Sequence, residues 1–289
     1  MSKLITSPHG GGKLGATADN QLIEMWVHGH SPCTDDYYRR TACRLLAHTS
    51  KPLSQTTLAD LQSFADALKD SGLAESSCRS YLAAVKSLLS FGNKLGVIPV
   101  NVGIPLRLPT PRDALTERIL TETDVALMIR LEPDTRNKVM LRLLYAGGLR
   151  VSELCGLRWQ DLTERSEGGQ VTVFGKGSKT RFVVLPAVIW KELVAVRGEA
   201  TADTPIFLTS KAKPMYRQQA WRIVKEAAMR IGIEEVSPHW FRHAHASHSL
   251  DRGAPIHLVQ QTLGHSSVAT TGRYLHARPS ESSAKFLAL

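Results

Sequence analysis

The chain has 289 residues, enough for two domains of ordinary size, each with its own core. Its composition, 43% hydrophobic and 21% charged, is that of a globular protein and excludes a largely disordered chain. A formal net charge of +10 indicates a polyanionic partner such as DNA or RNA, although a ribosome-associated or merely basic protein would have the same balance.

Four cysteines are scattered along the chain, at Cys33, Cys43, Cys78 and Cys155. They form no C-x-x-C pair, which is typical of reduced cysteines in an intracellular protein. No apolar run approaches the roughly 18 residues that a membrane span needs, and the N-terminus lacks the apolar segment of a secretory signal. Residues 1–18 are rich in glycine and polar residues and are expected to form a flexible tail. We therefore expect a cytoplasmic protein with no membrane partner.

Residues 19–98 are expected to form a helical domain. Apolar residues recur there at the i, i+3, i+4 spacing that is typical of amphipathic helices. One such set is Leu58, Leu61, Phe64, Ala65 and Leu68, and another is Tyr81, Leu82, Val85, Leu88 and Leu89. Ser31 followed by Pro32 predicts a helix start, and Gly92 or Gly96 predicts a helix end.

The opposite faces of these helices carry basic side chains. A cationic face is often only solvated, but four helices with basic faces suit docking onto the backbone of a DNA duplex. The residues that we expect to contact DNA from this domain are Arg39, Arg40, Arg44, Arg79 and Lys86.

A proline-rich segment, residues 99–113, follows the helical domain. Its prolines are Pro99, Pro105, Pro109 and Pro111. No helix or central strand tolerates prolines at that spacing, so we expect an extended linker. A second domain is expected over residues 114–289, with a C-terminal tail at 277–289.

The second domain is predicted to be mainly α-helical with a small β-sheet or hairpin. Thr121 and Asp124 predict a capped helix start, and Gly147-Gly148 predicts a break between two later helices. The segments QVTVF and TRFVVLP predict the strands of a hairpin turned by GKGSK. Further helices are expected near 186–197 and 216–231, after Ser237-Pro238, at Pro255 and around Tyr274.

Arg150 follows the glycine pair, at the entrance of the helix predicted over VSEL. Glu153 lies three residues later, on the same helix face, and can orient the guanidinium. A surface Arg–Glu pair would give the same two-residue pattern.

His239 and Arg242 lie three residues apart in the first turn of the helix predicted after Ser237-Pro238. Free backbone N–H groups at such a helix start favour an anion, and an arginine fork binds two phosphate oxygens at once. The i, i+4 pair of His239 and His243 also raises the alternative of a zinc site. However, HWFRH lacks the glutamate of H-E-x-x-H, and its arginine would repel a cation, so we predict no metal site. His243, His245 and His248 are expected to pack or to face solvent.

Two more candidate groups lie in the hairpin turn and at the C-terminal end. The turn GKGSKTR contains Lys176, Lys179 and Arg181, and a turn lysine is usually only solvated. His265 follows Leu263-Gly264, and Tyr274 lies nine residues later in GHSSVATTGRY. A tyrosine in a C-terminal helix is most often a packing residue.

The sequence as a whole resembles the tyrosine recombinase (phage integrase) family, and its Xer-like members in particular. The match runs from about Gln21 to about His276 and rests on the order GLRVSEL, GKGSKTR, HWFRH, LGH and the final tyrosine. Two departures are PVNVG, where Xer relatives often have Asn-Pro, and His245, where the family usually has an apolar residue. The resemblance implies a helical, SAM-like core-binding domain followed by an α/β catalytic domain.

The resemblance also implies the chemistry and the role of each site residue. Tyr274 would attack a DNA phosphate, leaving a 3′-phosphotyrosyl enzyme, with no metal, ATP or other cofactor. Arg150 and Arg242 would bind the scissile phosphate with Glu153 orienting Arg150, and Lys176 would protonate the departing 5′-hydroxyl. His239 and His265 would complete the catalytic set. Lys179 is the less favoured candidate for the general acid, and we expect Lys179 and Arg181 to contact DNA from the hairpin.

The expected partner is double-stranded DNA at a specific recombination site. The resemblance implies a homotetramer on DNA, or a heterotetramer with a second recombinase, acting at the nucleoid. Two alternatives remain open, a DNA-relaxing enzyme like the type IB topoisomerases and an inactive DNA-binding relative. The sequence alone does not separate chromosome-dimer resolution, phage integration, and integron or transposon excision.

Overall fold

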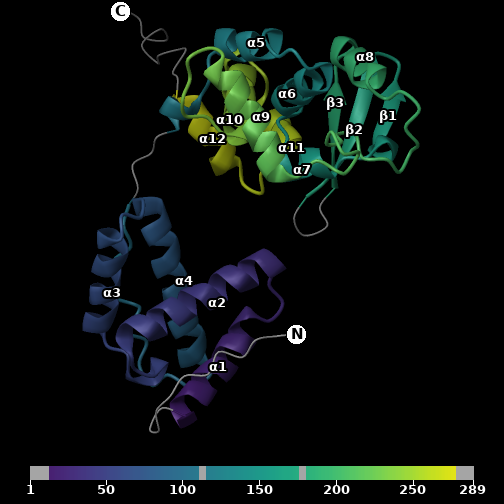
Figure 1. Cartoon of the computed structure of the whole chain (residues 1–289). Coiled ribbons are helices and arrows are strands. Elements are labelled where there is room, and N and C mark those ends of the chain that lie inside the picture. The colour runs from purple at the N-terminus through teal and green to yellow at the C-terminus, as the bar shows by residue number, and fades with distance from the viewer. Residues whose placement is uncertain (1–12, 111–114, 176–179, 278–289) are drawn as a thin grey trace, which may run out of the picture. The chain divides into compact units, whose positions relative to one another are not determined.

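The computed structural model describes residues 13–110, 115–175 and 180–277. The chain divides into two compact units, residues 1–112 and residues 113–289 (Figure 1). Each unit has a hydrophobic core of its own, as expected for separate domains.

The first unit is a helical bundle whose apolar faces meet in one core. Its elements are α1 (Lys13–Val27), α2 (Pro32–Thr49), the 3-10 turn η1 (Leu53–Gln55), α3 (Leu58–Asp70) and α4 (Glu75–Lys94). The helices predicted from the apolar spacing are confirmed. The buried residues of α3 and α4 include Leu61, Phe64, Leu68, Leu82, Val85, Leu88 and Leu89.

The start of the first unit differs from the prediction. Helix α1 begins at Lys13, so the expected flexible tail over residues 1–18 is wrong for residues 13–18. Residues 1–12 lie outside the described part. The first residues of α1, KLGATADNQ, have no apolar periodicity that would predict a helix.

The proline-rich segment after α4 is neither helix nor strand, as predicted, but its described part is anchored rather than free. Nζ of Lys86 donates to the carbonyl oxygens of Ile104 and Leu106, at 3.0 and 2.7 Å. Nη1 of Arg79 donates to the carbonyl oxygen of Pro109, at 2.7 Å. The segment is therefore held against α4 as far as Pro109.

The second unit is mainly helical and carries one three-stranded antiparallel sheet at its side (Figure 1). Its helices are α5 (Glu122–Arg130), α6 (Thr135–Gly147), α7 (Val151–Gly156), α8 (Ala187–Ala195), α9 (Arg217–Met229), α10 (Pro238–Asp251), α11 (Ile256–Leu263) and α12 (Val268–Ala277). Its strands are β1 (Leu162–Arg165), β2 (Gly168–Phe174) and β3 (Thr180–Leu185), with 3-10 turns η2 (Thr116–Arg118) and η3 (Trp159–Asp161). The capping box of Thr121 and Asp124 opens α5, as predicted.

The sheet contains the predicted hairpin and one additional strand. Strands β2 and β3 pair antiparallel, with Phe174 opposite Thr180 and Val171 opposite Val183. Strand β1, the sequence LTER, escaped prediction because an exposed polar edge strand is held mainly by its backbone bonds and shows little apolar alternation. Helix α8 packs against β2.

The junction between α6 and α7 depends on Gly148. This residue is left-handed, with φ +54° and ψ 31°, and ends α6. A Cβ added there would lie 2.7 Å from Cδ2 of Leu263 and 2.9 Å from Cδ2 of His245, so only glycine fits. The predicted break at the glycine pair is confirmed, and it delivers Arg150 to the N-cap of α7.

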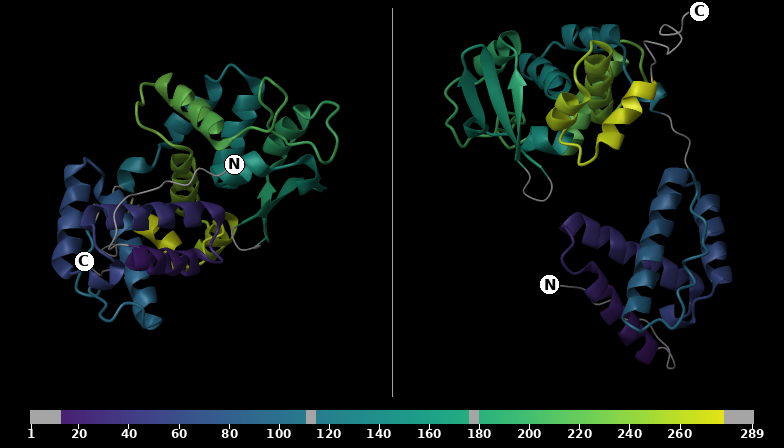
Figure 2. Two further views of the ribbon diagram at one scale, coloured as in Figure 1. Left: turned by 60° about the horizontal axis from the view of Figure 1, so that its bottom comes forward. Right: turned by 180° about the vertical axis from the view of Figure 1, so that it is seen from behind.

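A small apolar cluster joins α10, α11 and α12, and Figure 2 (right) shows these helices grouped at one end of the unit. Its buried members are Leu115, Ile119, Ala246, Val259, Leu263 and Tyr274. Because α10 also contacts α6, the cluster fixes the C-terminal helices against the segment that carries Arg150. Within the three described ranges, no helix has the length and apolar character needed to cross a membrane.

Candidate active site

Arg150 is held at the helix entrance by Glu153. Its Nη1 donates to Oε1 of Glu153, and its backbone N–H donates to Oε2 of the same carboxylate, both at 2.8 Å. The side chain of Arg150 is 37% exposed, whereas that of Glu153 is 5% exposed. The carboxylate is thus buried behind a guanidinium whose other edge remains accessible to a ligand.

Arg181 shares the same carboxylate. Its Nη1 and Nη2 donate to Oε1 and Oε2 of Glu153 at 2.8 Å, and its Nε donates to the carbonyl oxygen of Thr262 at 2.7 Å. Burial would raise the pKa of Glu153, but the hydrogen bonds from Arg181 and Arg150 outweigh burial and hold this pKa at about 2. We predicted that Arg181 contacts DNA. Its side chain is only 11% exposed and is bonded to Glu153 and Thr262, and the contact with DNA stays a prediction.

Arg242 is the most deeply buried cation of the site, at 4% exposure. Its Nη1 donates to the carbonyl oxygen of Gly148 at 2.6 Å and its Nη2 to that of Leu263 at 2.5 Å. These bonds tie α10 to the end of α6 and to the end of α11. Burial, and next the positive charge of Arg150, lower the pKa of Arg242 to about 10, so it remains charged at neutral pH.

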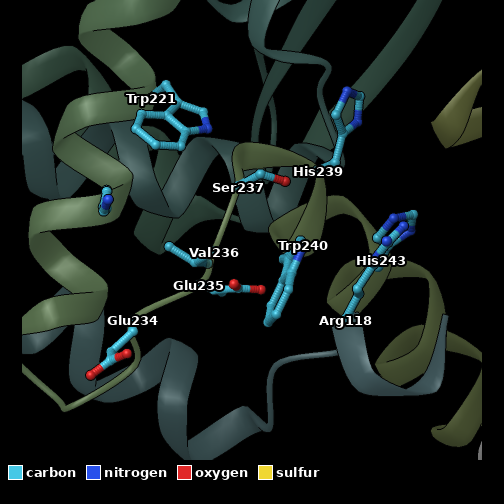
Figure 3. Close-up of a pocket in the computed structure, with 10 residues that line it drawn as sticks. Arg118, Trp221, Glu234, Glu235, Val236, Ser237, His239, Trp240 and His243 are labelled. Carbon is cyan, nitrogen blue, oxygen red and sulfur yellow. The ribbon is translucent and has the colours of Figure 1, made fainter. Parts of the chain in front are cut away.

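His239 and His243 lie on one side of α10, with ring centroids 6.5 Å apart, and Figure 3 shows Arg118 next to His243. The helix begins at Pro238 after Ser237, as predicted, although the Ser237 side chain makes no capping bond. Desolvation, followed by the charges of Arg242 and Arg150, lowers the pKa of His239. Desolvation, followed by His239 and Arg118, lowers the pKa of His243 to about 4.

Tyr274 lies on α12 with its ring in the apolar cluster and its hydroxyl at His243. The residue is 5% exposed, and its hydroxyl oxygen lies 2.8 Å from Nδ1 of His243. Burial raises the pKa of Tyr274, while the charges of Arg242 and Arg273 act in the opposite direction. The packing and functional interpretations of this tyrosine are thus compatible, because the ring packs and the hydroxyl is placed among polar groups.

His265 is positioned by the turn between α11 and α12. Gly264 is left-handed at φ +65° and ends α11, and Nδ1 of His265 lies 2.9 Å from Oγ1 of the fully buried Thr271. Desolvation, and then the charges of Arg242 and Arg150, lower the pKa of His265 to about 4. Its ring is therefore neutral at neutral pH.

Two cavities open at these residues. One, of about 870 Å³, has a lining that includes Arg150, Glu153, Phe174, Arg181 and His265. The other, of about 520 Å³, has a lining that includes Arg118, Trp221, His239, Trp240 and His243 (Figure 3). The first cavity has two guanidiniums against one carboxylate, which favours an anion such as phosphate, whereas Arg118 and Lys225 of the second are balanced by Glu234 and Glu235.

The structure brings most of the predicted set together. The charge of Arg242 acts on the pKa values of His239, His265 and Tyr274, and the charge of Arg150 acts on those of His239, Arg242 and His265, so these residues lie near one another. Lys176 and Lys179 lie outside the described residues, between β2 and β3.

The cations predicted to contact DNA from the first unit are less free than expected. Arg39 pairs with Glu24 and Asp35, and Arg40 pairs with Asp36. Among the others, the guanidinium of Arg44 lies over the ring of Tyr81, 5.3 Å from its centroid, and Arg79 and Lys86 hold the segment after α4. Arg79 and Lys86 thus hold that segment in place, a role that the sequence pattern did not reveal.

His243 is the site residue that sequence reasoning missed. We expected it to pack or face solvent, and its ring does pack beside Tyr274, but its contact with the Tyr274 hydroxyl was not predicted. The i, i+4 spacing from His239 was the available signal, but it suggested only a metal site. His245 and His248 do pack, since Nδ1 of His245 lies 2.8 Å from the carbonyl oxygen of Tyr145, and Nδ1 of His248 lies 2.9 Å from the Tyr145 hydroxyl. In the described part of the chain, no three His, Cys, Asp or Glu side chains are grouped to hold a metal ion.

Known family models match both units of the chain. Residues 118–281 match the model of the phage integrase family, and residues 24–94 match the phage integrase N-terminal SAM-like domain. The chain is 37% identical over 232 residues to tyrosine recombinase XerD of Chlorobaculum tepidum, covering 75% of this chain and 76% of that protein. It is 36% identical over 285 residues to tyrosine recombinase XerD of Yersinia pestis, covering 89% and 93%.

The fold has a counterpart among solved structures. A lambda integrase tetramer bound to a Holliday junction superposes with a TM-score of 0.72 at 15% identity, covering 91% of this chain and 83% of that chain. The protein therefore belongs to the phage integrase family, the tyrosine recombinases.

Proposed function

We propose that this protein is a site-specific DNA recombinase that cleaves and rejoins DNA through a 3′-phosphotyrosyl intermediate, without metal or ATP. Its family, and the recombinases to which it is similar over most of their length, support the proposal. The roles given below to individual residues are part of the same proposal.

One observation carries the chemistry, namely the buried guanidinium of Arg242. Its hydrogen bonds to the described residues go to two carbonyl oxygens and to no carboxylate. Glu153 carries one negative charge against the two guanidiniums that it binds, Arg150 and Arg181. A buried positive charge without full compensation is costly unless an anion binds beside it. This excess of positive charge supports a phosphate as the ligand.

The reaction balances with the groups present. The Tyr274 oxygen attacks phosphorus, the bond from phosphorus to the 5′-oxygen breaks, and that oxygen leaves as a 5′-hydroxyl after taking a proton. Arg150 and Arg242 stabilise the added negative charge of the pentacoordinate transition state, which is usually the largest catalytic contribution. A 5′-hydroxyl of the partner duplex then attacks the phosphotyrosine and restores Tyr274, so the phosphodiester bond energy is conserved.

Two proton transfers accompany the cleavage step. The proton of Tyr274 passes to His243, which lies at hydrogen-bond distance, because a bound phosphate anion raises the pKa of nearby histidines and favours their protonation. His239 and His265 bind non-bridging phosphate oxygens. Lys176, the general acid that the family resemblance implies, protonates the 5′-oxygen.

The proposed partner is a duplex bearing a specific recombination site, bound by the helical domain over residues 19–98 and the catalytic domain over 114–289. We propose assembly into a homotetramer, or a heterotetramer with a second recombinase, on two duplexes in the cytoplasm at the nucleoid. The similar lambda integrase is described as a tetramer bound to a Holliday junction.

Strand exchange between two duplexes tests the function. Bound duplexes are first selected from a random pool, and the recovered sequence is then placed in two labelled fragments of different length. We expect recombinant fragments with the wild-type chain in excess chelator and none with Tyr274→Phe. Relaxation of a supercoiled plasmid without fragment exchange would favour the topoisomerase-like alternative, and binding with neither activity would favour the inactive relative.

A further inference from the structure

Three segments that are distant in the sequence meet at Arg181. This residue is the second of strand β3, Glu153 lies in α7, and Thr262 lies near the end of α11. In the guanidinium of Arg181, Nη1 and Nη2 donate to the carboxylate of Glu153, and Nε donates to the carbonyl oxygen of Thr262, at 2.7–2.8 Å. One planar group thus joins the sheet to both helices.

The contact with Glu153 controls the placement of Arg150. The carboxylate receives Arg181 across both oxygens, which fixes its plane in the way that fork-to-fork pairs do. The same two oxygens also accept the backbone N–H and Nη1 of Arg150. A rotation of the carboxylate would therefore move Arg150.

The sharing of one carboxylate also has an electrostatic consequence. With Arg181 present, two guanidiniums compete for one negative charge, and positive charge remains on the side of Arg150. Without Arg181, Glu153 would neutralise Arg150 alone and weaken its attraction for a phosphate. Removing one partner of a buried ion pair also destabilises the fold, so the test of this role must separate positioning and charge from general structural damage.

The contact with Thr262 reaches His265. Only Leu263 and Gly264 separate Thr262 from His265, and Leu263 is also the residue whose carbonyl oxygen accepts from Arg242. The stem of Arg181 packs against the turn, since a Cβ added at Gly264 would lie 3.0 Å from Cδ of Arg181. The turn that carries His265 is thus held from the sheet side.

We propose that Arg181 is a positioning residue of the phosphate site, which sets Arg150 through Glu153 and sets His265 through the Thr262 carbonyl. The proposal rests on the function proposed above. It assigns Arg181 no contact with the reacting atoms.

Cleavage of two matched substrates tests this role. Arg181→Met removes the bonds and keeps much of the volume, Arg181→Lys keeps the charge without the fork, and Arg142→Met is the control because Arg142 forms an ion pair with Glu192. Selected duplexes carry either the natural phosphate or a neutral methylphosphonate at the cleavage position. We expect Arg181→Met to cleave the natural duplex about tenfold to a hundredfold more slowly, with DNA affinity changed less than about threefold.

The neutral substrate separates positioning from general structural damage. A methylphosphonate needs less charge stabilisation, so the gap between Arg181→Met and wild type should narrow several-fold, as it should for Arg150→Ala. The cleavage rate of Arg181→Lys should lie between those of wild type and Arg181→Met. The lysine variant replaces the methionine variant if the latter fails to fold. An equal loss on both substrates, a wild-type rate, or a loss of affinity without a loss of rate would overturn the proposal, and the last result would instead indicate a DNA contact.

A measurement without DNA keeps this proposal distinct from the proposed function. The Nε–H NMR signal of Arg150 and the ring signals of His265 should shift in Arg181→Met and stay in place in Arg142→Met. Unchanged signals would overturn the positioning role. If the signals shift but the wild-type chain cleaves no duplex, then the proposed function fails while the positioning role stands.

Discussion

Nδ1 of His243 and the hydroxyl oxygen of Tyr274 lie 2.8 Å apart, across the packed helices α10 and α12. The direction of this hydrogen bond depends on the ring tautomer, because Nδ1 is either a donor or an acceptor. With a pKa near 4, His243 is neutral at neutral pH and retains one nitrogen that can accept a proton. The pair is therefore suited both to orient the phenol and to receive its proton.

Replacing His243 should slow cleavage without preventing DNA binding. We expect His243→Ala to reduce the single-turnover cleavage rate by about a hundredfold, the usual scale for a lost general base. His243→Asn should retain more activity, because its amide group occupies nearly the same place as Nδ1. The exposed residue His257 supplies the control variant, His257→Ala. A wild-type rate in His243→Ala would show that the contact serves only packing.

Gly148→Ala should destabilise the catalytic unit far more than a comparable change elsewhere. Both Gly148 and Gly253 are left-handed, but a Cβ at Gly253 would meet no atom within 4 Å, whereas a Cβ at Gly148 would meet Leu263 and His245. Backbone strain alone should cost about 1 kcal/mol in Gly253→Ala, and strain with overpacking about 3 kcal/mol in Gly148→Ala. Urea denaturation measures the free energy of unfolding of both variants. Equal losses in the two variants would mean that the junction at Gly148 can expand at no cost.

Stability should fall as the pH is lowered from about 7 to about 4. Burial is the main cause that lowers the pKa values of His243, His245 and His265 from 6.5 to about 4. Above about pH 6.5 these rings are neutral in both the folded and unfolded states, and their full contribution to stability is present. As the pH falls from 6.5 to about 4, the unfolded chain takes up protons on these rings that the folded chain does not, so folding becomes less favourable.

Chemical denaturation across this pH range checks the prediction. His245→Asn removes one titrating ring and can still donate to the carbonyl oxygen of Tyr145, so its stability should depend less steeply on pH. Glu153 would add its own loss only at lower pH, because its pKa is depressed to about 2 from 4.5. A flat stability profile between about pH 7 and pH 5 would contradict the assignment of neutral, buried rings.

The role of Lys176 can be tested chemically, although this residue lies outside the described part of the chain. We expect Lys176→Ala to slow cleavage by about a hundredfold, as for a lost general acid. A substrate with a 5′-thiol leaving group needs no protonation and should restore most of the rate. Rescue in Lys179→Ala, and not in Lys176→Ala, would place the acid three residues later in the hairpin turn.

The helical architecture could be predicted because its signals are local. The apolar stripe of α3, the capping box at Thr121 and the glycine pair before Arg150 each determine a local conformation, and the structure has all three. Strand β1 could not be predicted, because LTER has no apolar face and owes its state to pairing with β2.

Site geometry was predictable only where one helix carries the residues. His239 and Arg242 share the first turn of α10, so their common face followed from their spacing. The contacts of Arg181 with Glu153 and of His243 with Tyr274 join different elements, and nothing local in the sequence specifies them. The same is true of Lys86, whose ammonium group donates to carbonyl oxygens of a later segment.

The most direct measurement of the central claim is the identification of the residue that becomes linked to DNA. A nicked duplex bearing the selected site loses a short 5′-hydroxyl fragment after cleavage, and this loss traps the covalent complex for digestion and mass spectrometry. The account predicts one DNA adduct, on the peptide that contains Tyr274 and through a 3′-phosphate, with excess chelator present. Tyr274→Phe should bind the same duplex and give no adduct. An adduct on another residue, or one that persists in Tyr274→Phe, would contradict the account.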